Sequence, residues 1–263
     1  MGQAQEGLAV IIPARLASTR LPRKLLALAA GRPILEWTWR RACLACGPDA
    51  VWIATDSDEI ASAAASFGAR VVPTGEHRCG TERVAEAATR LSPTPEWVIN
   101  LQGDEPLVEL GTLRALARAL SCDPGSIATC GAPLESPAAW LDPAVVKVVD
   151  AADGRILYFS RAPVPGTREG GGAEAFVRVS RRVRRHIGIY GFPRALLARF
   201  VTLAPAPLEE AESLEQMRAI EAGLPMRLVR VAAAPPAVDT PADLEAVRRI
   251  LASADGAGGD GDG

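Results

Sequence analysis

The sequence predicts an α/β protein. Short apolar runs, each of the length of a buried strand, alternate along the chain with longer segments whose apolar residues recur at helical spacing. Gly and Pro fall at the junctions between these segments, where turns are expected. An alternation of this kind is typical of a sheet whose strands are joined by helices that pack on its faces.

The first part of the chain carries this alternation most clearly. Pro13 is expected to end the first strand, because proline cannot donate to a sheet ladder. Asp56 and Glu59 have the spacing of a capping box, which predicts that Asp56 caps the second helix. Strands are expected at 8–12, 51–54, 70–72 and 97–101, and helices at 34–46, 57–67 and 81–91.

The second part predicts a hairpin and several further helices. Two short strands flank the turn at 151–154, and the Gly/Pro-rich segment 163–174 predicts a mobile loop. The basic run 178–185 is expected to be a solvated strand or loop face. Further strands are expected at 126–132, 145–150, 155–159, 186–192 and 226–231, and helices at 112–121, 193–200, 208–222 and from Thr240 onwards. We expect one domain over 1–252 and a disordered Gly/Asp tail over 253–263.

Composition excludes several classes of function. The chain has 263 residues, 48% of them hydrophobic, and a formal net charge of -2, which favours neither a nucleic-acid nor a membrane partner. No apolar run is long enough to span a bilayer, and the N-terminus lacks the apolar core of a signal peptide, so the cytoplasm is the expected location. The odd count of 5 Cys argues against a disulfide framework.

A cationic loop follows the first strand. Arg15, Arg20, Arg23 and Lys24 are interleaved with small residues such as Ser18. Ligands of α/β folds bind beyond the carboxyl ends of the strands, and cations with free backbone N–H groups hold phosphate there. The loop is neither a Walker motif nor a G-x-G-x-x-G motif. The alternative interpretation is a surface loop with scattered charges.

Two further segments place charge at the ends of predicted elements. Asp104 follows the strand at 97–101 in a Gly/Pro loop, where a carboxylate suits a Mg²⁺ ligand, although an Asp that only makes a turn is the alternative. Arg83 lies in the first turn of a helix, where the helix dipole favours acids, which suggests an anionic ligand nearby.

Five motifs in order resemble one family. They are I-P-A-R-L-A-S-T-R-L-P-R-K at 12–24, H-R-C-G-T-E-R at 77–83, N-L-Q-G-D-E-P at 100–106, R-H-I-G-I-Y-G-F at 185–192 and V-D-T-P at 238–241. Over about 9–251 the chain resembles the 3-deoxy-manno-octulosonate cytidylyltransferase (CMP-Kdo synthetase) family. It departs from the family pattern at Cys79, where a serine is usual, at Arg23, where a small residue is usual, and at Gly166, where a tryptophan is usual. Arg23 is expected either to add a phosphate contact or to point to solvent.

The resemblance implies a fold and a reaction. The fold is a three-layer α/β/α sandwich with a mostly parallel mixed sheet, of the nucleotide-diphospho-sugar transferase type and generally a homodimer. The reaction is CMP transfer from CTP to 3-deoxy-D-manno-octulosonate (Kdo), giving CMP-Kdo and pyrophosphate for lipopolysaccharide biosynthesis, with Mg²⁺ as cofactor. The general base of the reaction stays open, and direct displacement needs no covalent nucleophile.

The resemblance also implies roles for particular residues. Those expected to act in catalysis are Arg15, Lys24 and Asp104, and those expected to hold Mg²⁺ are Asp104 and Asp239. Nucleotide contacts are expected from Ala14, Arg15, Ser18, Lys24, Arg83 and Gln102. Sugar-acid contacts are expected from Arg161, His186, Tyr190, Glu215 and Gln216, with Arg161 and His186 as the two cations that face the carboxylate.

Three other functions compete with this one. A cytidylyltransferase for another acid sugar, such as a sialic acid or an amino-Kdo, is the nearest. A nucleotide-sensing module without turnover is a second, and the intact Asp104 and Asp239 count against it. A nicotinamide dehydrogenase is a third, and the missing glycine motif excludes it.

Overall fold

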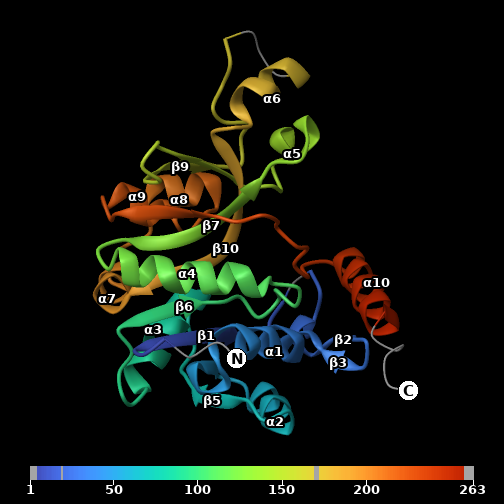
Figure 1. The fold of residues 1–263 in the computed structure, drawn as a ribbon. Helices are drawn as coiled ribbons and strands as arrows, with labels where there is room; N and C mark the ends of the chain where they lie inside the picture. The colour runs from blue at the N-terminus through green and yellow to red at the C-terminus, as the bar shows by residue number, and fades with distance from the viewer. Residues whose placement is uncertain (1–4, 19, 169–171, 258–263) are drawn as a thin grey trace. The chain divides into compact units, whose positions relative to one another are not determined.

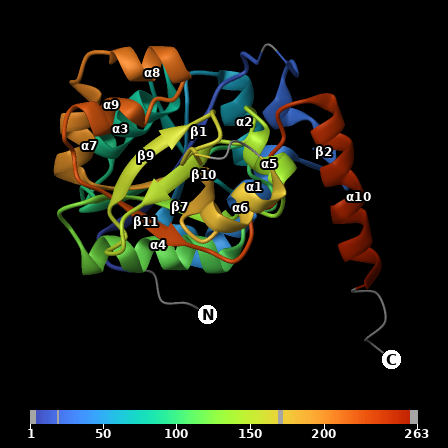
Figure 2. The same ribbon diagram turned by 90° about the horizontal axis from the view of Figure 1, so that it is seen from above.

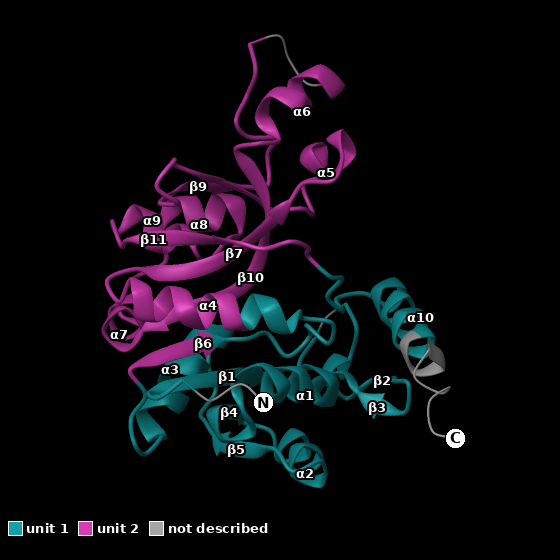
Figure 3. Ribbon diagram, viewed as in Figure 1, with its two compact units in different colours: residues 1–95, 100–113, 235–263 teal, residues 96–99, 114–234 magenta. Residues whose placement is uncertain are grey.

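The computed structural model describes residues 5–18, 20–168 and 172–257. The chain divides into two compact units, which Figure 3 shows in two colours: residues 1–95, 100–113 and 235–263 form the first, and residues 96–99 and 114–234 form the second. Each unit is built from more than one segment of the chain, and such units can belong to one cooperative domain. The single domain expected over 1–252 therefore stays a prediction. No helix in the described part of the chain is long and apolar enough to cross a membrane.

The first unit is built on three parallel strands. β1 pairs with β4, and β4 pairs with β5, so the carboxyl ends of all three lie at one edge. Every residue of β1 is buried. Elements of this unit in Figure 1 are β1 (Leu8–Ala14), η1 (Lys24–Leu26), β2 (Leu28–Ala29), β3 (Arg32–Pro33), α1 (Ile34–Cys46), η2 (Pro48–Ala50), β4 (Val51–Thr55), α2 (Asp58–Ser66), β5 (Arg70–Pro73), α3 (Gly80–Arg90) and α10 (Pro241–Ala257). β6 (Trp97–Asn100) and α4 (Leu110–Cys122) each begin in one unit and end in the other.

A small apolar cluster joins the C-terminal helix to the first unit. Figures 1 and 2 both show α10 beside β2. Val238, Leu244 and Val247 pack there with Ala29 and Ile34, and all five are buried. This cluster fixes the start of α10, and with it the segment that carries Asp239.

The second unit contains a mixed sheet in the order β11-β7-β10-β6, with β8 and β9 added at the start of β10. β11 is parallel to β7, and the pairs β7–β10, β10–β8 and β8–β9 are antiparallel. Its elements are β7 (Ile127–Pro133), α5 (Pro137–Leu141), β8 (Lys147–Asp150), β9 (Ile156–Ser160), α6 (Ala173–Val179), β10 (Val183–Pro193), α7 (Arg194–Val201), α8 (Pro207–Glu212), α9 (Met217–Glu221) and β11 (Met226–Arg230).

Two expected features of the first unit were wrong. Pro13 lies inside β1, in register with Ala54 of β4, because a strand accepts proline where no ladder N–H is required. Ser57, not Asp56, caps α2, and its hydroxyl accepts a hydrogen bond from Ile60 N at 3.3 Å. The Asp56 side chain is instead paired with Arg83.

Expected boundaries also differ in the second half of the chain. The helix expected at 208–222 is two helices, because Ser213 adopts the left-handed conformation with φ 50° and ends α8. The basic run at 178–185 is divided between the end of α6 and the start of β10. Of the expected loop at 163–174, residues 169–171 lie outside the described residues, and α6 begins at Ala173. α10 continues to Ala257, into the stretch expected to be a disordered tail, and 258–263 lie outside the described residues.

Candidate active site

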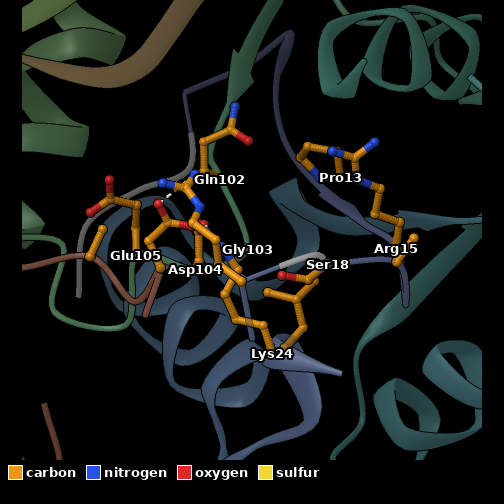
Figure 4. Close-up of a pocket in the computed structure, with 13 residues that line it drawn as sticks. Pro13, Arg15, Ser18, Lys24, Gln102, Gly103, Asp104 and Glu105 are labelled. Carbon is orange, nitrogen blue, oxygen red and sulfur yellow. Dashed lines mark hydrogen bonds and ion pairs between the residues drawn. The ribbon is translucent and has the colours of Figure 1, made fainter. Parts of the chain in front are cut away.

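One pocket of the first unit contains most of the residues that the sequence assigned to the nucleotide and the metal. Its volume is about 590 Å³. Figure 4 shows Pro13 and Arg15 on one side of it and the segment from Gln102 to Glu105 on the other. The pocket is lined by Pro13, Arg15, Ala17, Ser18, Arg20, Lys24, Leu25, Gln102, Gly103, Asp104, Glu105, Ala237 and Asp239.

Lys24 brings the two expected metal ligands together. Its Nζ donates to Asp104 Oδ2 at 2.5 Å and to Asp239 Oδ1 at 3.3 Å. The Lys24 side chain is only 13% exposed, so this contact is shielded from much of the solvent. Two aspartates that are far apart in the sequence therefore meet at one cation, as the sequence predicts.

Backbone contacts fix the Asp104 loop. Leu101 N donates to Ile11 O at 3.2 Å, which places the chain after β6 beside β1. Thr38 Oγ1 on α1 donates to Gly103 O at 2.9 Å. A Cβ at Gly103 would lie 3.2 Å from Leu25 Cδ1 and 3.3 Å from Pro13 O, so the loop approaches its neighbours closely at a residue with no side chain.

The start of α10 fixes Asp239. Val238 N donates to Asp104 O at 2.9 Å, which ties the two acidic segments together. Asp243 Oδ2 accepts from Asp239 N at 3.2 Å and from Thr240 N at 2.8 Å. Burial raises the pKa of Asp243, but the hydrogen bonds from Thr240 and from the Asp239 backbone outweigh burial, and the pKa lies below its usual value.

The cations of the loop have different partners. Arg20 Nη2 lies 2.6 Å from Asp239 Oδ2, while Arg15 is exposed at the pocket. Arg23 adopts the left-handed conformation with φ 55° and forms an ion pair with Glu59 of α2. Arg23 is therefore directed to a protein carboxylate rather than into the pocket.

Arg83 lies apart from the pocket lining. Its side chain is 4% exposed and donates to Asp56 Oδ2 at 2.7 Å and to Thr74 Oγ1 at 2.5 Å. The anion that its position suggested is thus Asp56 of the same unit. Ala14 is also absent from the lining, because it is the buried last residue of β1.

Three of the expected sugar-acid residues form a cluster in the second unit. The Thr129 hydroxyl donates to Ile189 O at 2.8 Å, so its oxygen accepts from His186 Nε2 at 3.0 Å. The His186 ring also packs against the Tyr190 ring at a tilt of 52°, with ring centroids 5.5 Å apart. Burial raises the pKa of Tyr190 well above its usual value, and the charge of Glu215 raises it further, which indicates that Glu215 belongs to this cluster.

The expected cationic role of His186 is wrong. Burial lowers its pKa from 6.5 to about 3, so the ring is neutral at pH 7. His186 is then a hydrogen-bonding group rather than a cation that faces a carboxylate.

Arg161 is engaged with the backbone around it. Its guanidinium donates to Glu212 O at 2.8 Å, to Pro143 O at 3.1 Å and to Ser213 O at 3.4 Å. These contacts are those of an arginine that joins three segments. Gln216 is buried at the start of α9, in the break between the two helices.

Sequence reasoning missed three residues that position the charged groups. Arg20 could have been found from the sequence, because it is one of the cations of the loop after the first strand. Asp243 lies in the first turn of the last helix, and its carboxylate holds the Asp239 backbone. Glu212, which accepts from Ser160 Oγ at 2.7 Å and from Arg161 N at 2.8 Å, gave no signal in the sequence.

Comparison with known proteins identifies the family. A family model described as cytidylyltransferase matches residues 9–228. The chain belongs to the cytidylyltransferase family. It is 47% identical over 247 residues to the 3-deoxy-manno-octulosonate cytidylyltransferase of Anaeromyxobacter sp. (strain Fw109-5), which covers 93% of this chain and 97% of that protein. A second protein of that name, from Myxococcus xanthus, is 45% identical and covers 92% and 95% of the two chains. The family predicted from the five motifs is confirmed.

Solved structures of cytidylyltransferases support the fold. The structure described as CMP:2-keto-3-deoxy-manno-octonic acid synthetase complexed with CTP is 36% identical, with a TM-score of 0.86 over 94% of this chain and 99% of that one. The 4-diphosphocytidyl-2C-methyl-D-erythritol synthase of Anaerococcus prevotii shares the fold alone, at 12% identity, a TM-score of 0.60 and coverage of 94% and 100%. The predicted class, a three-layer α/β fold with a mostly parallel mixed sheet, is confirmed by these neighbours.

Proposed function

We propose that this cytidylyltransferase transfers CMP from CTP to Kdo, giving CMP-Kdo and pyrophosphate. The names of relatives 44–47% identical to it and the CTP in a structural neighbour support the proposal. The observation that carries it is the meeting of Lys24, Asp104 and Asp239 in one pocket beside the cationic loop.

The pocket residues suit a bound triphosphate. Arg15 and Lys24 supply positive charge for the phosphates, and Ser18 and Gln102 supply polar side chains for phosphate or base. The hydroxyl on the anomeric carbon of Kdo loses its proton to water and its oxygen bonds to the α-phosphorus. The bond from that phosphorus to the oxygen that bridges it to the β-phosphate breaks, and pyrophosphate leaves. Fixed cations stabilise the charge that builds on the leaving group.

The donor set of the pocket fits Mg²⁺. This ion is typically bound by one or two protein carboxylates and completes its octahedron with water and phosphate oxygens. Asp104 and Asp239 would hold it, and bound Mg²⁺ would neutralise phosphate charge. In the described ranges, no group of three or more His, Cys, Asp or Glu residues could hold a metal ion.

The sugar-acid residues belong to the second unit. His186 supplies a neutral hydrogen-bonding group, and Tyr190, Glu215 and Gln216 supply polar groups for hydroxyls. Arg161 is the one cation of the predicted set, and we propose that it contributes positive charge toward the Kdo carboxylate while its backbone contacts keep it in place.

The experiment that tests the function measures pyrophosphate release with CTP and Mg²⁺ and three acceptors: Kdo, an amino-Kdo and a sialic acid. We expect release with Kdo at least 100-fold faster than with sialic acid, on the order of 3 kcal/mol of discrimination. Release with sialic acid but not with Kdo would replace the substrate. CTP binding without release with any acceptor would favour a nucleotide sensor.

Two further properties accompany this proposal. We propose a homodimer, which light scattering on the purified protein would test against a mass of 27.6 kDa per chain. We also propose a cytoplasmic location, the compartment in which a CTP-dependent enzyme meets its nucleotide. Fractionation of expressing cells would test it.

A further inference from the structure

The charges of the pocket neutralise one another. Lys24 Nζ lies 2.5 Å from Asp104 Oδ2 and 3.3 Å from Asp239 Oδ1. Arg20 Nη2 lies 2.6 Å from the other oxygen of Asp239. Two carboxylates are therefore matched by two cations from one short stretch of the loop.

The ammonium group lies where a shared divalent ion would bind. Asp104 and Asp239 would hold Mg²⁺ through the same carboxylates that Lys24 contacts. The Lys24 Nζ already bridges one oxygen of each, so the two cations cannot occupy this place together. A metal that arrives alone must displace the ammonium group and then bear its repulsion at short range.

A nucleotide changes this balance. A triphosphate carries more negative charge than either aspartate and offers phosphate oxygens both to the loop cations and to a metal. The Arg20 side chain is 68% exposed, so it can turn toward a phosphate without unpacking the core. As the cations move to the phosphates, both carboxylates become available.

We propose that Lys24 and Arg20 hold the place of the divalent cation until the triphosphate arrives, so that metal and nucleotide bind cooperatively. The inference rests on the proposed function of the pocket. It assigns Arg20, which the sequence had left without a role, to the control of Asp239. It also requires that nucleotide and metal raise each other's affinity by the same factor.

The test is metal binding without nucleotide, with Mn²⁺ as a paramagnetic probe of the divalent site and no CTP present. Removal of a placeholder should tighten binding. We expect Lys24→Met to lower the Kd for Mn²⁺ about tenfold and Arg20→Gln about threefold, because each frees a carboxylate from a competing charge. An active-site substitution usually weakens ligand binding. Here the variant that loses a triphosphate contact is expected to bind the metal more tightly.

Arg23→Gln is the matched control. It removes one positive charge from the same loop, next to Lys24, but from a side chain paired with Glu59. We expect its Kd for Mn²⁺ to equal that of the wild type. Asp104→Asn added to Lys24→Met should abolish the gain, which would locate the bound ion at the two carboxylates.

The outcomes separate this inference from the proposed function. Equal or weaker Mn²⁺ binding by Lys24→Met, checked for folding by its thermal melt, would overturn the placeholder even if the wild type releases pyrophosphate with Kdo. If Lys24→Met does not fold, the exposed Arg20→Gln decides, and an unchanged Kd there overturns the inference. If the wild type shows no turnover, the proposed function is overturned. The Kd values for Mn²⁺ then still decide whether Lys24 and Arg20 compete with the metal.

Discussion

Lys24 is the residue on which the proposed chemistry depends. Its side chain is mostly buried, and its Nζ contacts both aspartates that the family resemblance assigned to the metal. An ammonium group attracts carboxylates at this distance, so Lys24 and the two aspartates hold one another in place. The pocket is thereby prepared to exchange one cation for another without leaving an aspartate unpaired.

His186 gives a residue-scale prediction about pH. Its pKa is about 3 in the folded protein and 6.5 ordinarily, so between these values the unfolded chain binds more protons. Folding stability is full above pH 6.5 and falls as the pH drops toward 3, by up to about 1.4 kcal/mol per pH unit. His186→Gln should lose less stability than the wild type between pH 7 and pH 5 in urea titrations.

Comparing the wild type with His186→Gln removes the effect of the other titrating groups. Both carry the same carboxylates, so only the histidine distinguishes their pH dependence. An identical loss of stability in the wild type and in His186→Gln would show that the ring is accessible enough to take up a proton in the folded state.

At the scale of elements, Gly103 and Gly111 form a contrasting pair. Gly103→Ala places a methyl group 3.2 Å from Leu25 side-chain carbons and 3.3 Å from Pro13 O, and we expect a loss of about 1–3 kcal/mol of stability. Gly111 lies near the start of α4 with nothing within 4 Å of an added Cβ. Gly111→Ala should raise stability by a few tenths to about 1 kcal/mol. Thermal melts would check both, and a gain for Gly103→Ala would contradict the close approach.

Asp243 couples the last helix to the pocket. Asp243→Ala removes the acceptor for Asp239 N and Thr240 N, so we expect it to destabilise the protein by about 1 kcal/mol, as loss of a helix cap does. Because the Asp239 backbone is then less fixed, the Mg²⁺ concentration for half-maximal pyrophosphate release should also rise. Asp243→Asn keeps an acceptor oxygen and should restore most of both. A normal metal requirement in Asp243→Ala would limit Asp243 to a capping role.

Helices and strands were predicted well where they depend on the spacing of apolar residues within one segment. The buried strand before the cationic loop and the helices at 34–46 and 81–91 followed from apolar spacing, and the structure places them within a few residues. The failures arose from tertiary contacts. The helix expected at 208–222 is broken where the Glu212 side chain contacts Ser160 and Arg161. Asp56 forms an ion pair with Arg83 instead of capping α2.

Much of the candidate site could be predicted because its residues lie in the motifs that resemble the family. The convergence of Asp104 and Asp239 on Lys24 followed from the family resemblance and is present in the structure. Arg83 could not be judged from the sequence, because the helix-dipole argument shows that an anion is near but not whether it is a ligand or a side chain. The neutral state of His186 depends on burial among residues from several strands, which no local pattern contains.

At the scale of the whole molecule, the chain gathers its charged groups from segments far apart in the sequence. One pocket of the first unit is lined by Arg15, Ala17, Ser18, Arg20 and Lys24, by residues 102–105, and by Ala237 and Asp239. The Val238–Asp104 backbone hydrogen bond shows that the two acidic segments are joined directly, not only through Lys24. The central claim is therefore that Asp104 and Asp239 act as one unit in holding a cation for the nucleotide.

A double-mutant cycle on kcat/KM for CTP tests this claim most directly. Asp104→Asn and Asp239→Asn should each lower kcat/KM about 100-fold or more, on the order of 3 kcal/mol, with thermal melts near that of the wild type. The exposed Asp58→Asn on α2 serves as the control for loss of one negative charge. If the two aspartates hold the same cation, the double variant should be no worse than the poorer single one. Losses that multiply in the double variant would show two independent roles and would contradict the account.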